Sequence, residues 1–431
     1  MWLLVLALNA PGQLSSDSIY QMTEGITGVY ASMHPPVMSA LLGLLYRVFP
    51  GTGLYLLIAS TPFFVALLLV STNLRPRIWP LIALVCLMLS PLVLIYQGIV
   101  WKDVLFANLV AGSFASVTAG DRARQDGRKG AGAAWILASI GCAAIAILVR
   151  QNGAIMLPFL GLSLGALAIG PGRLHAALGL GIGSVVLAIL CAWGVSALVS
   201  ATAVSHVDYL AVGLRSLEQY DMAGIAAGQA VVAPSVPGVD AATVQHYLDA
   251  LGKNYSPERD DTLSDVPALV PFDRSGDHAM RGLWWQLVIR HPAAYLVHRF
   301  QFYRWLLFPP QPRRCLPFHV GIAGPPAMLA RLGLNETARP GDRALSRYGN
   351  LFLNSPLYWN GAWLLLAAGL LLGFARHIRS DLPVACLLAS SICIAASYLL
   401  VGIACDMRYC YVVPVAVAVA LARLTGTRSA A

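Results

Sequence analysis

The stretch Leu174–Ser200, LHAALGLGIGSVVLAILCAWGVSALVS, decides the fold class of this chain. Its residues are almost all apolar or small, and a helix rises about 1.5 Å per residue, so the stretch can cross a hydrocarbon core of roughly 30 Å. We expect a membrane-spanning helix here and in each of the other long apolar stretches, which are Gly53–Ser71, Trp79–Trp101, Val104–Ala119, Ala131–Val149, Gly153–Gly170, Pro356–Ala375, Leu382–Cys405 and Tyr409–Leu424.

The composition agrees with this pattern. Of the 431 residues, 58% are hydrophobic and only 11% are charged, and the mean hydropathy is +0.68. Such a chain has too little polar surface to cover a soluble globule of its size. The sequence therefore predicts an all-α polytopic membrane protein with about ten transmembrane helices, juxtamembrane helices and one large external loop.

The tenth helix is expected at the start of the chain. Met1–Ala10 is apolar but too short to cross a bilayer, and it lacks the basic start and the cleavage site of a secretory signal. We interpret it as the outer end of a first helix whose beginning is missing through a misplaced start codon.

The positive charges of the chain follow the expected topology. The formal net charge is +9, but the cations form no patch or recognition motif, so we expect no nucleic-acid partner. If Met1–Ala10 leaves the cytoplasm, the short outer connections after residue 52 hold only Lys102, Arg150 and Arg408. The inner connections hold many more, as the positive-inside rule requires: Arg75, Arg77, Arg122, Arg124, Arg128, Lys129, Arg173, Arg376, Arg379, Arg423 and Arg428.

The division of the chain follows from the same count. We expect an N-terminal transmembrane module over 1–200 with a first external loop at 11–52, a large extracytoplasmic segment over 201–355, and C-terminal transmembrane helices over 356–431. Trp284–Phe308 resembles a further span, but charges such as Arg299 and Arg304 cost roughly 2.5–3.5 kcal/mol each near the bilayer centre. We therefore expect Tyr295–Phe308 to lie in the membrane interface.

The cysteines and a glycine-rich run are given structural interpretations. The chain has no CxxC pair, and only Cys315, Cys405 and Cys410 are expected to meet an oxidising compartment, where any two of them could form a disulfide. The run Gly179, Gly181 and Gly183 lies inside a span. It favours close helix packing over a phosphate-binding loop, since no GK[ST] follows it.

Polar clusters at the ends of the spans are expected to share the outer side. Any one of them can be explained as a helix cap or as side chains that reach the membrane surface. Together they indicate chemistry, because a carboxylate can accept the proton of a hydroxyl while cations neutralise a departing phosphate. The clusters are Asp17 with Tyr20 and Gln21; His34-Pro35-Pro36; Trp101-Lys102-Asp103; Arg150-Gln151-Asn152; and Asp406-Met407-Arg408-Tyr409.

These clusters resemble the GT-C superfamily of multi-spanning glycosyltransferases, and within it the bacterial protein mannosyltransferase and aminoarabinose transferase type. Members carry an acidic motif after the first helix, followed by a basic residue and Pro-Pro. Here Asp17 stands at the acidic position and His34-Pro35-Pro36-Val37 at the second. Trp101-Lys102-Asp103-Val104-Leu105-Phe106, Arg150-Gln151-Asn152-Gly153 and Arg408-Tyr409 are similar to an uncharacterised bacterial branch. The resemblance covers most of the chain in layout, through short motifs.

The resemblance implies a GT-C-like bundle and an inverting transfer of a sugar, hexosyl or pentosyl, from a polyprenyl-phosphate donor. The acceptor would be a glycan, a lipid or a protein of the cell envelope. The site would face the periplasm or exterior of a bacterial cytoplasmic membrane, with Asp17 as general base. Its substrate-binding residues would be Tyr20, Gln21, His34, Lys102, Asp103, Arg150, Asn152, Arg408 and Tyr409.

One departure bears on metal use. Many members have two neighbouring acids in the first loop, whereas Asp17 has Ser16 and Ser18 beside it. A second carboxylate could come from Glu24 or from Asp103. No cofactor is required by the sequence, and a divalent metal with His34 as a ligand is left open.

Two alternatives and two local predictions remain. A transporter or flippase of lipid-linked saccharides would use the same cations, but transporters usually bind near the bilayer midplane and often have repeated halves. A scaffold would explain the spans but not the polar clusters. In the large segment, Asp221 is expected to cap a helix rather than bind an acceptor. His291 is expected at a helix boundary, because it precedes a proline.

Overall fold

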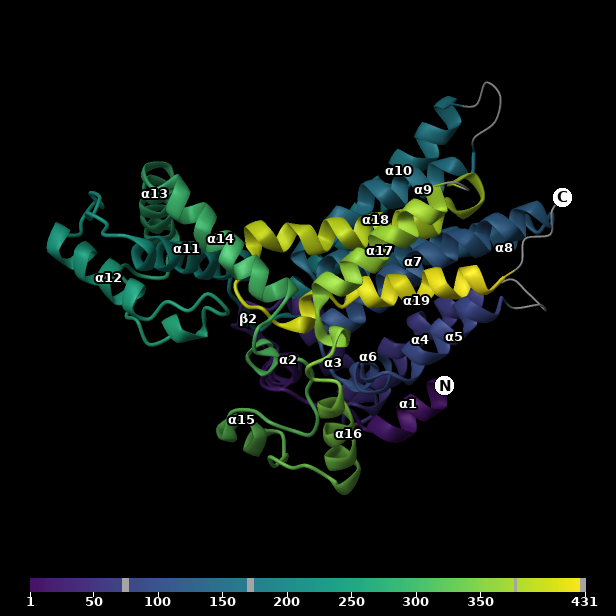
Figure 1. Ribbon diagram of the computed structural model, residues 1–431, viewed down its shortest axis with the longest axis horizontal. Coiled ribbons are helices and arrows are strands. Elements are labelled where there is room, and N and C mark those ends of the chain that lie inside the picture. The colour runs from purple at the N-terminus through teal and green to yellow at the C-terminus, as the bar shows by residue number, and fades with distance from the viewer. Residues whose placement is uncertain (72–76, 169–173, 376–377, 427–431) are drawn as a thin grey trace. The chain divides into compact units, whose positions relative to one another are not determined.

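The computed structural model describes residues 1–71, 77–168, 174–375 and 378–426, and most of these residues are helical (Figure 1). The described chain has one short sheet, in which β1 (Val29–Tyr30) pairs in parallel with β2 (Ser205–His206). This all-α polytopic architecture is the predicted fold class. Of the predicted inner cations, Arg75, Arg173, Arg376, Arg428 and the side chain of Arg379 lie outside the described residues.

The chain divides into two compact units. Unit 1 comprises Met1–His206, Phe318–Ala395 and Arg408–Ala431, and unit 2 comprises Val207–Pro317 and Ala396–Met407. The predicted segment 201–355 thus contributes to both units. Its placement outside the membrane stays a prediction.

Unit 1 contains most of the helices. They are α1 (Trp2–Asn9), α2 (Ser16–Thr27), α3 (Pro36–Val48), α4 (Gly53–Val70), α5 (Ile78–Leu89), α6 (Pro91–Leu94), α7 (Lys102–Gln125), α8 (Lys129–Val149), α9 (Leu157–Ala166), α10 (Leu174–Thr202), α15 (Pro326–Arg331), α16 (Pro340–Leu351), α17 (Asn360–Ala375), most of α18 (Ile378–Val401) and α19 (Val412–Thr425). Short 3₁₀ turns precede several of them, including Tyr96–Gly98, Gln151–Met156 and Met407–Cys410.

Six helices in the described residues are long and apolar enough to cross a membrane: α4, α7, α8, α10, the Asp381–Val401 part of α18, and α19 with the turn before it. A seventh span is formed if α5 and the bent segment Pro91–Gly98, which meet at 53°, count as one. Each predicted apolar stretch therefore contains a helix. The stretch Gly153–Gly170 yields only the short α9 within the described residues, and α17 is also below span length.

The burial of the spans separates the centre of the bundle from its lipid-facing rim. α7 packs against α4, α8 and α19 (Figure 1), and 89% of its span window is buried. Only 22% of the α10 window is buried, so α10 faces lipid. Within the glycine run, a Cβ at Gly181 would lie 2.6 Å from the Gly161 carbonyl oxygen, whereas Gly179 and Gly183 have open space. Close packing is thus confirmed at Gly181 alone.

The two ends of the bundle differ in chemistry. α7 runs from Lys102 to Gln125, and α8 returns beside it from Lys129 to Val149. At the far end, Arg122 donates to the Leu69 carbonyl at 2.6 Å, and the Arg77 amide donates to the Thr425 carbonyl at 2.8 Å. Lys102, Arg150 and Arg408 lie at the opposite end of α7, α8 and α19. Those predicted inner cations that the structure describes, such as Arg122 and Lys129, therefore lie at the other end of the bundle from the outer cations, as the predicted topology requires.

Unit 2 is built from α11 (Tyr209–Gly228), α12 (Ala241–Lys253), α13 (Arg274–Arg290) and α14 (Pro292–Leu307), with the last turn of α18. α11 packs against the other three helices of Val207–Pro317. His291 separates α13 from α14, as its place before Pro292 predicts.

Candidate functional site

Backbone pairing brings two helix N-termini of unit 1 together. Gln13 accepts a hydrogen bond from the Val100 amide at 3.0 Å and donates its own amide to Gly98 at 2.9 Å. Gln13 lies shortly before the start of α2, and Val100 lies shortly before the start of α7. The first turns of α2 and α7 carry Asp17 and Asp103, and a carboxylate is favoured there by the helix dipole.

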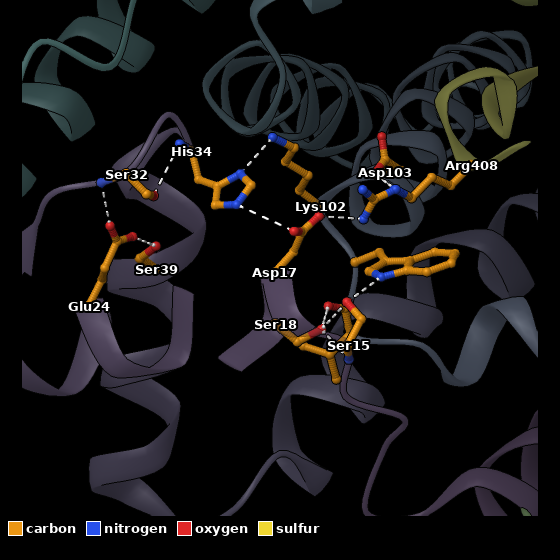
Figure 2. Close-up of polar contacts among 12 residues, drawn as sticks. Ser15, Asp17, Ser18, Glu24, Ser32, His34, Ser39, Lys102, Asp103 and Arg408 are labelled. Atoms are coloured by element: carbon orange, nitrogen blue, oxygen red, sulfur yellow. Dashed lines mark hydrogen bonds and ion pairs between the residues drawn. The ribbon is translucent and has the colours of Figure 1, made fainter. Parts of the chain in front are cut away.

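Asp17 lies between a guanidinium and an imidazole (Figure 2). Its Oδ2 atom is 2.6 Å from Arg408 Nη1, and its Oδ1 atom is 3.8 Å from His34 Nε2. The carboxylate side chain remains 30% exposed, so a ligand can reach it. Burial alone would raise the pKa of Asp17, but the charges of Arg408 and Lys102 outweigh burial and hold this pKa well below its usual range.

Asp103 provides the second carboxylate of the site. Its side chain is 1% exposed, forms an ion pair with Arg150, and lies 3.8 Å from Arg408 Nε through its Oδ2 atom. Arg408 therefore reaches both carboxylates. The Tyr409 ring lies 4.8 Å from the Arg150 guanidinium and 5.7 Å from that of Arg408, so one aromatic ring is within cation–π range of both arginines.

His34 joins Asp17 to a third cation. Lys102 Nζ lies 3.0 Å from His34 Nδ1 (Figure 2). Burial and the charge of Lys102 lower the pKa of His34 to about 3, so the imidazole is uncharged at neutral pH. Lys102 then donates to Nδ1, and the Nε2–H of the ring faces Asp17.

We call Asp17, His34, Lys102, Asp103, Arg150 and Arg408 the ionic cluster. When Lys102 is protonated, the cluster has three cations and two carboxylates, so it then carries one positive charge in excess. Each arginine pairs with a carboxylate, whereas Lys102 has no carboxylate within ion-pair distance in the described part of the chain. The cluster is therefore suited to a bound anion, and Lys102 is the cation that is available to it.

Trp101 was not assigned a role from the sequence, but it fixes the geometry of the cluster. Its ring lies 4.9 Å from the Arg408 guanidinium, and its Nε1–H donates to Ser15 Oγ at 2.8 Å. Ser15 is the N-cap of α2, and Ser18 Oγ accepts from the Ser15 amide and donates to the Val100 carbonyl. One buried indole thus holds both the helix of Asp17 and its arginine partner.

Glu24 does not join the ionic cluster among the described residues. Its carboxylate accepts hydrogen bonds from the amides of Ala31 and Ser32 at 3.0 and 2.9 Å, and from Ser39 Oγ at 2.9 Å (Figure 2). The helices α2 and α3 approach closely here, because a Cβ at Gly25 would lie 1.8 Å from the Ser39 carbonyl oxygen. Glu24 therefore stabilises the turn that presents His34. Of the two candidates for a second carboxylate, Asp103 is the one in the cluster.

Two predicted residues, Tyr20 and Gln21, lie apart from these contacts among the described residues. Tyr20 is 38% exposed on α2, and Gln21 is 1% exposed with an Nε2 atom that has no hydrogen-bond partner among the described residues. Neither forms a hydrogen bond or ion pair with the ionic cluster in that part of the chain. Asn152 is half-buried in the 3₁₀ turn that follows Arg150.

His319 also helps to position the site, although no pattern in the sequence predicted this role. Its Nε2 atom lies 2.9 Å from the Leu14 carbonyl oxygen, and the Leu14 amide donates to Gly321 at 2.9 Å. A segment far along the chain therefore fixes the residues that lead into α2. Nothing in the motif around His319 marks this contact.

The side chains of the described residues offer no assembled ligand set for a divalent metal. They contain no group of three or more His, Cys, Asp or Glu side chains placed to hold one. Asp17 and Asp103 are instead matched with arginines. The use of a divalent metal, which the sequence left open, remains to be tested.

In unit 2, Asp221 has a structural role that the sequence did not predict. It lies inside α11 and is fully buried, so the prediction that it caps a helix is wrong. Its carboxylate pairs with His298 at 3.2 Å and with Arg299, and accepts from Trp284 Nε1 at 2.8 Å. The sequence offered no partner for this acid, because its partners come from α13 and α14.

A disulfide links Cys315 to Cys405, with Cα atoms 4.9 Å apart, and Cys410 is buried as a free thiol. The structure thus selects one of the pairings that the sequence left open. A disulfide is typical of an oxidising compartment. Cys405 lies in the connection between α18 and α19, three positions before Arg408.

Comparisons with known proteins do not assign this chain to a family. No family model matches the chain, and no curated protein matches it. Among solved structures it is similar to the archaeal oligosaccharyltransferase AglB from Archaeoglobus fulgidus, in complex with an inhibitory peptide and a dolichol-phosphate, with a TM-score of 0.40 and 13% identity. The match covers 98% of this chain and 49% of that one, so this chain spans about half its length. A likeness this distant decides neither family nor activity.

Proposed function

We propose that this protein is a membrane glycosyltransferase that moves a sugar from a polyprenyl-phosphate donor to an acceptor hydroxyl at the outer face of the cytoplasmic membrane. The observation that carries the proposal is the ionic cluster. It combines a reachable carboxylate with an excess of positive charge at the ends of apolar helices. Such a place suits a substrate whose tail stays in the bilayer while its phosphate reaches the surface.

Lys102 would bind the donor phosphate first. It is the cation without a carboxylate partner among the described residues, and it lies at the N-terminus of α7, where amide dipoles also favour an anion. Arg408 and Arg150 would then share the charge that grows on the phosphate as it leaves. These contacts are charge-assisted and strengthen as the transition state is approached.

Asp17 would act as the general base. The acceptor oxygen attacks the anomeric carbon and forms the new bond, while the bond from that carbon to the phosphate oxygen breaks. The hydroxyl proton passes to Asp17, and the electron pair leaves with the polyprenyl phosphate. In the free protein Arg408 keeps Asp17 ionised but weakly basic. A donor phosphate that pairs with Arg408 would weaken the ion pair between Arg408 and Asp17. The pKa of Asp17 would then rise, and the carboxylate would be a better base.

The disulfide supports the outer placement. Cys405 and Arg408 belong to the same short connection between α18 and α19, and an oxidised cysteine three positions before Arg408 favours the oxidising side of the membrane. The positive-inside distribution favours the same side.

The proposal is tested by mass spectrometry of envelope glycans and glycolipids from cells with and without the gene. A mass difference of one sugar should disappear on deletion and return with the wild-type gene. It should not return with Asp17→Asn. Asp126→Asn is the matched control, because Asp126 is exposed at the opposite end of α7 and pairs only with Arg128 in the described structure. Unchanged glycans after deletion would contradict the proposal.

A further inference from the structure

The helix α14 of unit 2 carries a stripe of exposed apolar side chains. Leu296, Val297 and Phe300 are 52%, 55% and 60% exposed, and Arg304 is exposed one turn further along. These positions follow each other at the three- and four-residue spacing of one helix face. A contiguous apolar patch of this kind marks an interaction surface more often than a solvated one.

The opposite face of α14 is buried inside unit 2. His298 and Arg299 are each 1% exposed and pair with Asp221, and Tyr255 hydroxyl lies 2.9 Å from His298 Nδ1. Gly224 of α11 lies so close that a Cβ there would be 2.2 Å from the His298 ring. The helix is thus fixed in rotation, and the apolar stripe cannot turn into the core of the unit.

This buried face of α14 also contacts the residue that follows a candidate membrane span. Arg299 Nη1 donates to the Gly402 carbonyl at 2.7 Å, and a Cβ at Gly402 would lie 2.3 Å from the Phe302 ring. Gly402 directly follows Asp381–Val401, a candidate span whose last residues, from Ala396 on, belong to unit 2 together with α14. Because a span ends at the bilayer surface, α14 is held at that level.

We propose that α14 lies in the bilayer interface, with Leu296, Val297 and Phe300 among the outer acyl chains and Arg304 at the lipid phosphates. The helix is about 24 Å long at 1.5 Å per residue, which is too short to cross a core of roughly 30 Å. It contains no acidic residue, so its exposed charge is positive and favours anionic lipids. The sequence indicated an interfacial segment, and the structure assigns the face that enters the lipid. This inference does not depend on the proposed enzyme activity.

The test uses the full chain in lipid nanodiscs. The free cysteines Cys86, Cys142, Cys191, Cys386, Cys393 and Cys410 are replaced by alanine, and the Cys315–Cys405 disulfide is kept. Single cysteines are introduced as Val297→Cys, Phe300→Cys and, on the exposed side of α12, His246→Cys, and each is labelled with an environment-sensitive fluorophore. Quenching by lipids that carry a spin label on the acyl chain is compared with quenching by aqueous iodide.

We expect blue-shifted emission at positions 297 and 300, quenched by the spin-labelled lipid and protected from iodide, while position 246 shows the reverse. Adding phosphatidylglycerol to phosphatidylcholine nanodiscs should increase the blue shift at position 300, and Arg304→Gln should remove that increase. Iodide quenching at 297 and 300 equal to that at 246 would overturn the proposal. An unchanged blue shift with phosphatidylglycerol would overturn the preference for anionic lipid.

Discussion

The Nη1 atom of Arg408 lies 2.6 Å from the Oδ2 atom of Asp17, although the two residues stand at opposite ends of the chain. Arg408 also lies 3.8 Å from Asp103, so one guanidinium joins the first turns of α2 and α7. The site is therefore assembled from the N-terminal loop, the start of α7 and the turn before α19. A change in any of these segments should affect the others.

Lys102→Gln should weaken the binding of a sugar-free polyprenyl phosphate by about ten- to a hundredfold, because one charge-assisted contact to the phosphate is lost. Lys102→Arg should keep part of the affinity. Binding is measured by quenching or calorimetry with the reconstituted protein. Lys129→Gln, a change at the other end of the bundle, serves as control and should bind as the wild type does. Equal affinity for all four proteins would remove Lys102 from the phosphate site.

Trp101→Phe should reduce the rate of sugar transfer by about tenfold, because the aromatic ring beside Arg408 remains but the hydrogen bond to Ser15 is lost. Trp101→Leu removes both contacts and should reduce the rate further. Trp193→Phe is the matched control, because Trp193 is 72% exposed on the lipid-facing α10. If Trp101→Phe and Trp193→Phe are equally active, the indole does not position the base.

The protein should lose stability as the pH is lowered, because His34 is buried as an uncharged ring. Its pKa is about 3 in the folded protein and about 6.5 in the unfolded chain, so between these values only the unfolded state binds the proton. The stability contributed by the neutral ring is complete above pH 6.5 and is lost as the pH falls toward 3. Thermal midpoints from pH 7 to pH 4 should fall more steeply for the wild type than for His34→Asn. His246→Asn should keep the wild-type slope, and an identical slope for His34→Asn would contradict the buried, uncharged ring.

The ionic cluster should be reachable from outside the cell. Ser16 and Gln151 are exposed neighbours of Asp17 and Arg150, whereas the exposed Asp126 lies at the opposite end of the bundle. In a background without the free cysteines, Ser16→Cys and Gln151→Cys should react with a membrane-impermeant thiol reagent in intact cells. Asp126→Cys should react only after the membrane is opened. Labelling of positions 16 and 151 from different sides would show that the cluster cannot exist in the membrane.

The sequence predicted the fold class and the end of the bundle that holds the polar clusters, because both follow from local composition. Apolar runs such as Leu174–Ser200 specify a lipid-facing helix without help from the rest of the chain. The separation of Lys102 from Arg122 along α7 is set by helix geometry alone.

The contacts inside the site could not be predicted in the same way. Trp101 acts through Ser15 and Arg408, and His319 acts through the Leu14 carbonyl, so their roles depend on pairing between distant segments. Glu24 was a plausible second carboxylate by its distance from Asp17 along α2. Its side chain is instead engaged with the turn at Ser32, and Asp103 reaches the cluster from another helix.

The most direct test is transfer from a purified polyprenyl-phosphate sugar by the reconstituted protein, measured as release of the polyprenyl phosphate in the presence of an envelope extract as acceptor. Asp17→Asn should lower the rate by about a hundred- to ten-thousandfold, as expected for loss of a general base, while the protein still binds sugar-free polyprenyl phosphate. Asp126→Asn should leave the rate unchanged. Wild-type rates with Asp17→Asn would contradict the role of Asp17, and no release by the wild-type protein with any such donor would contradict the proposed activity.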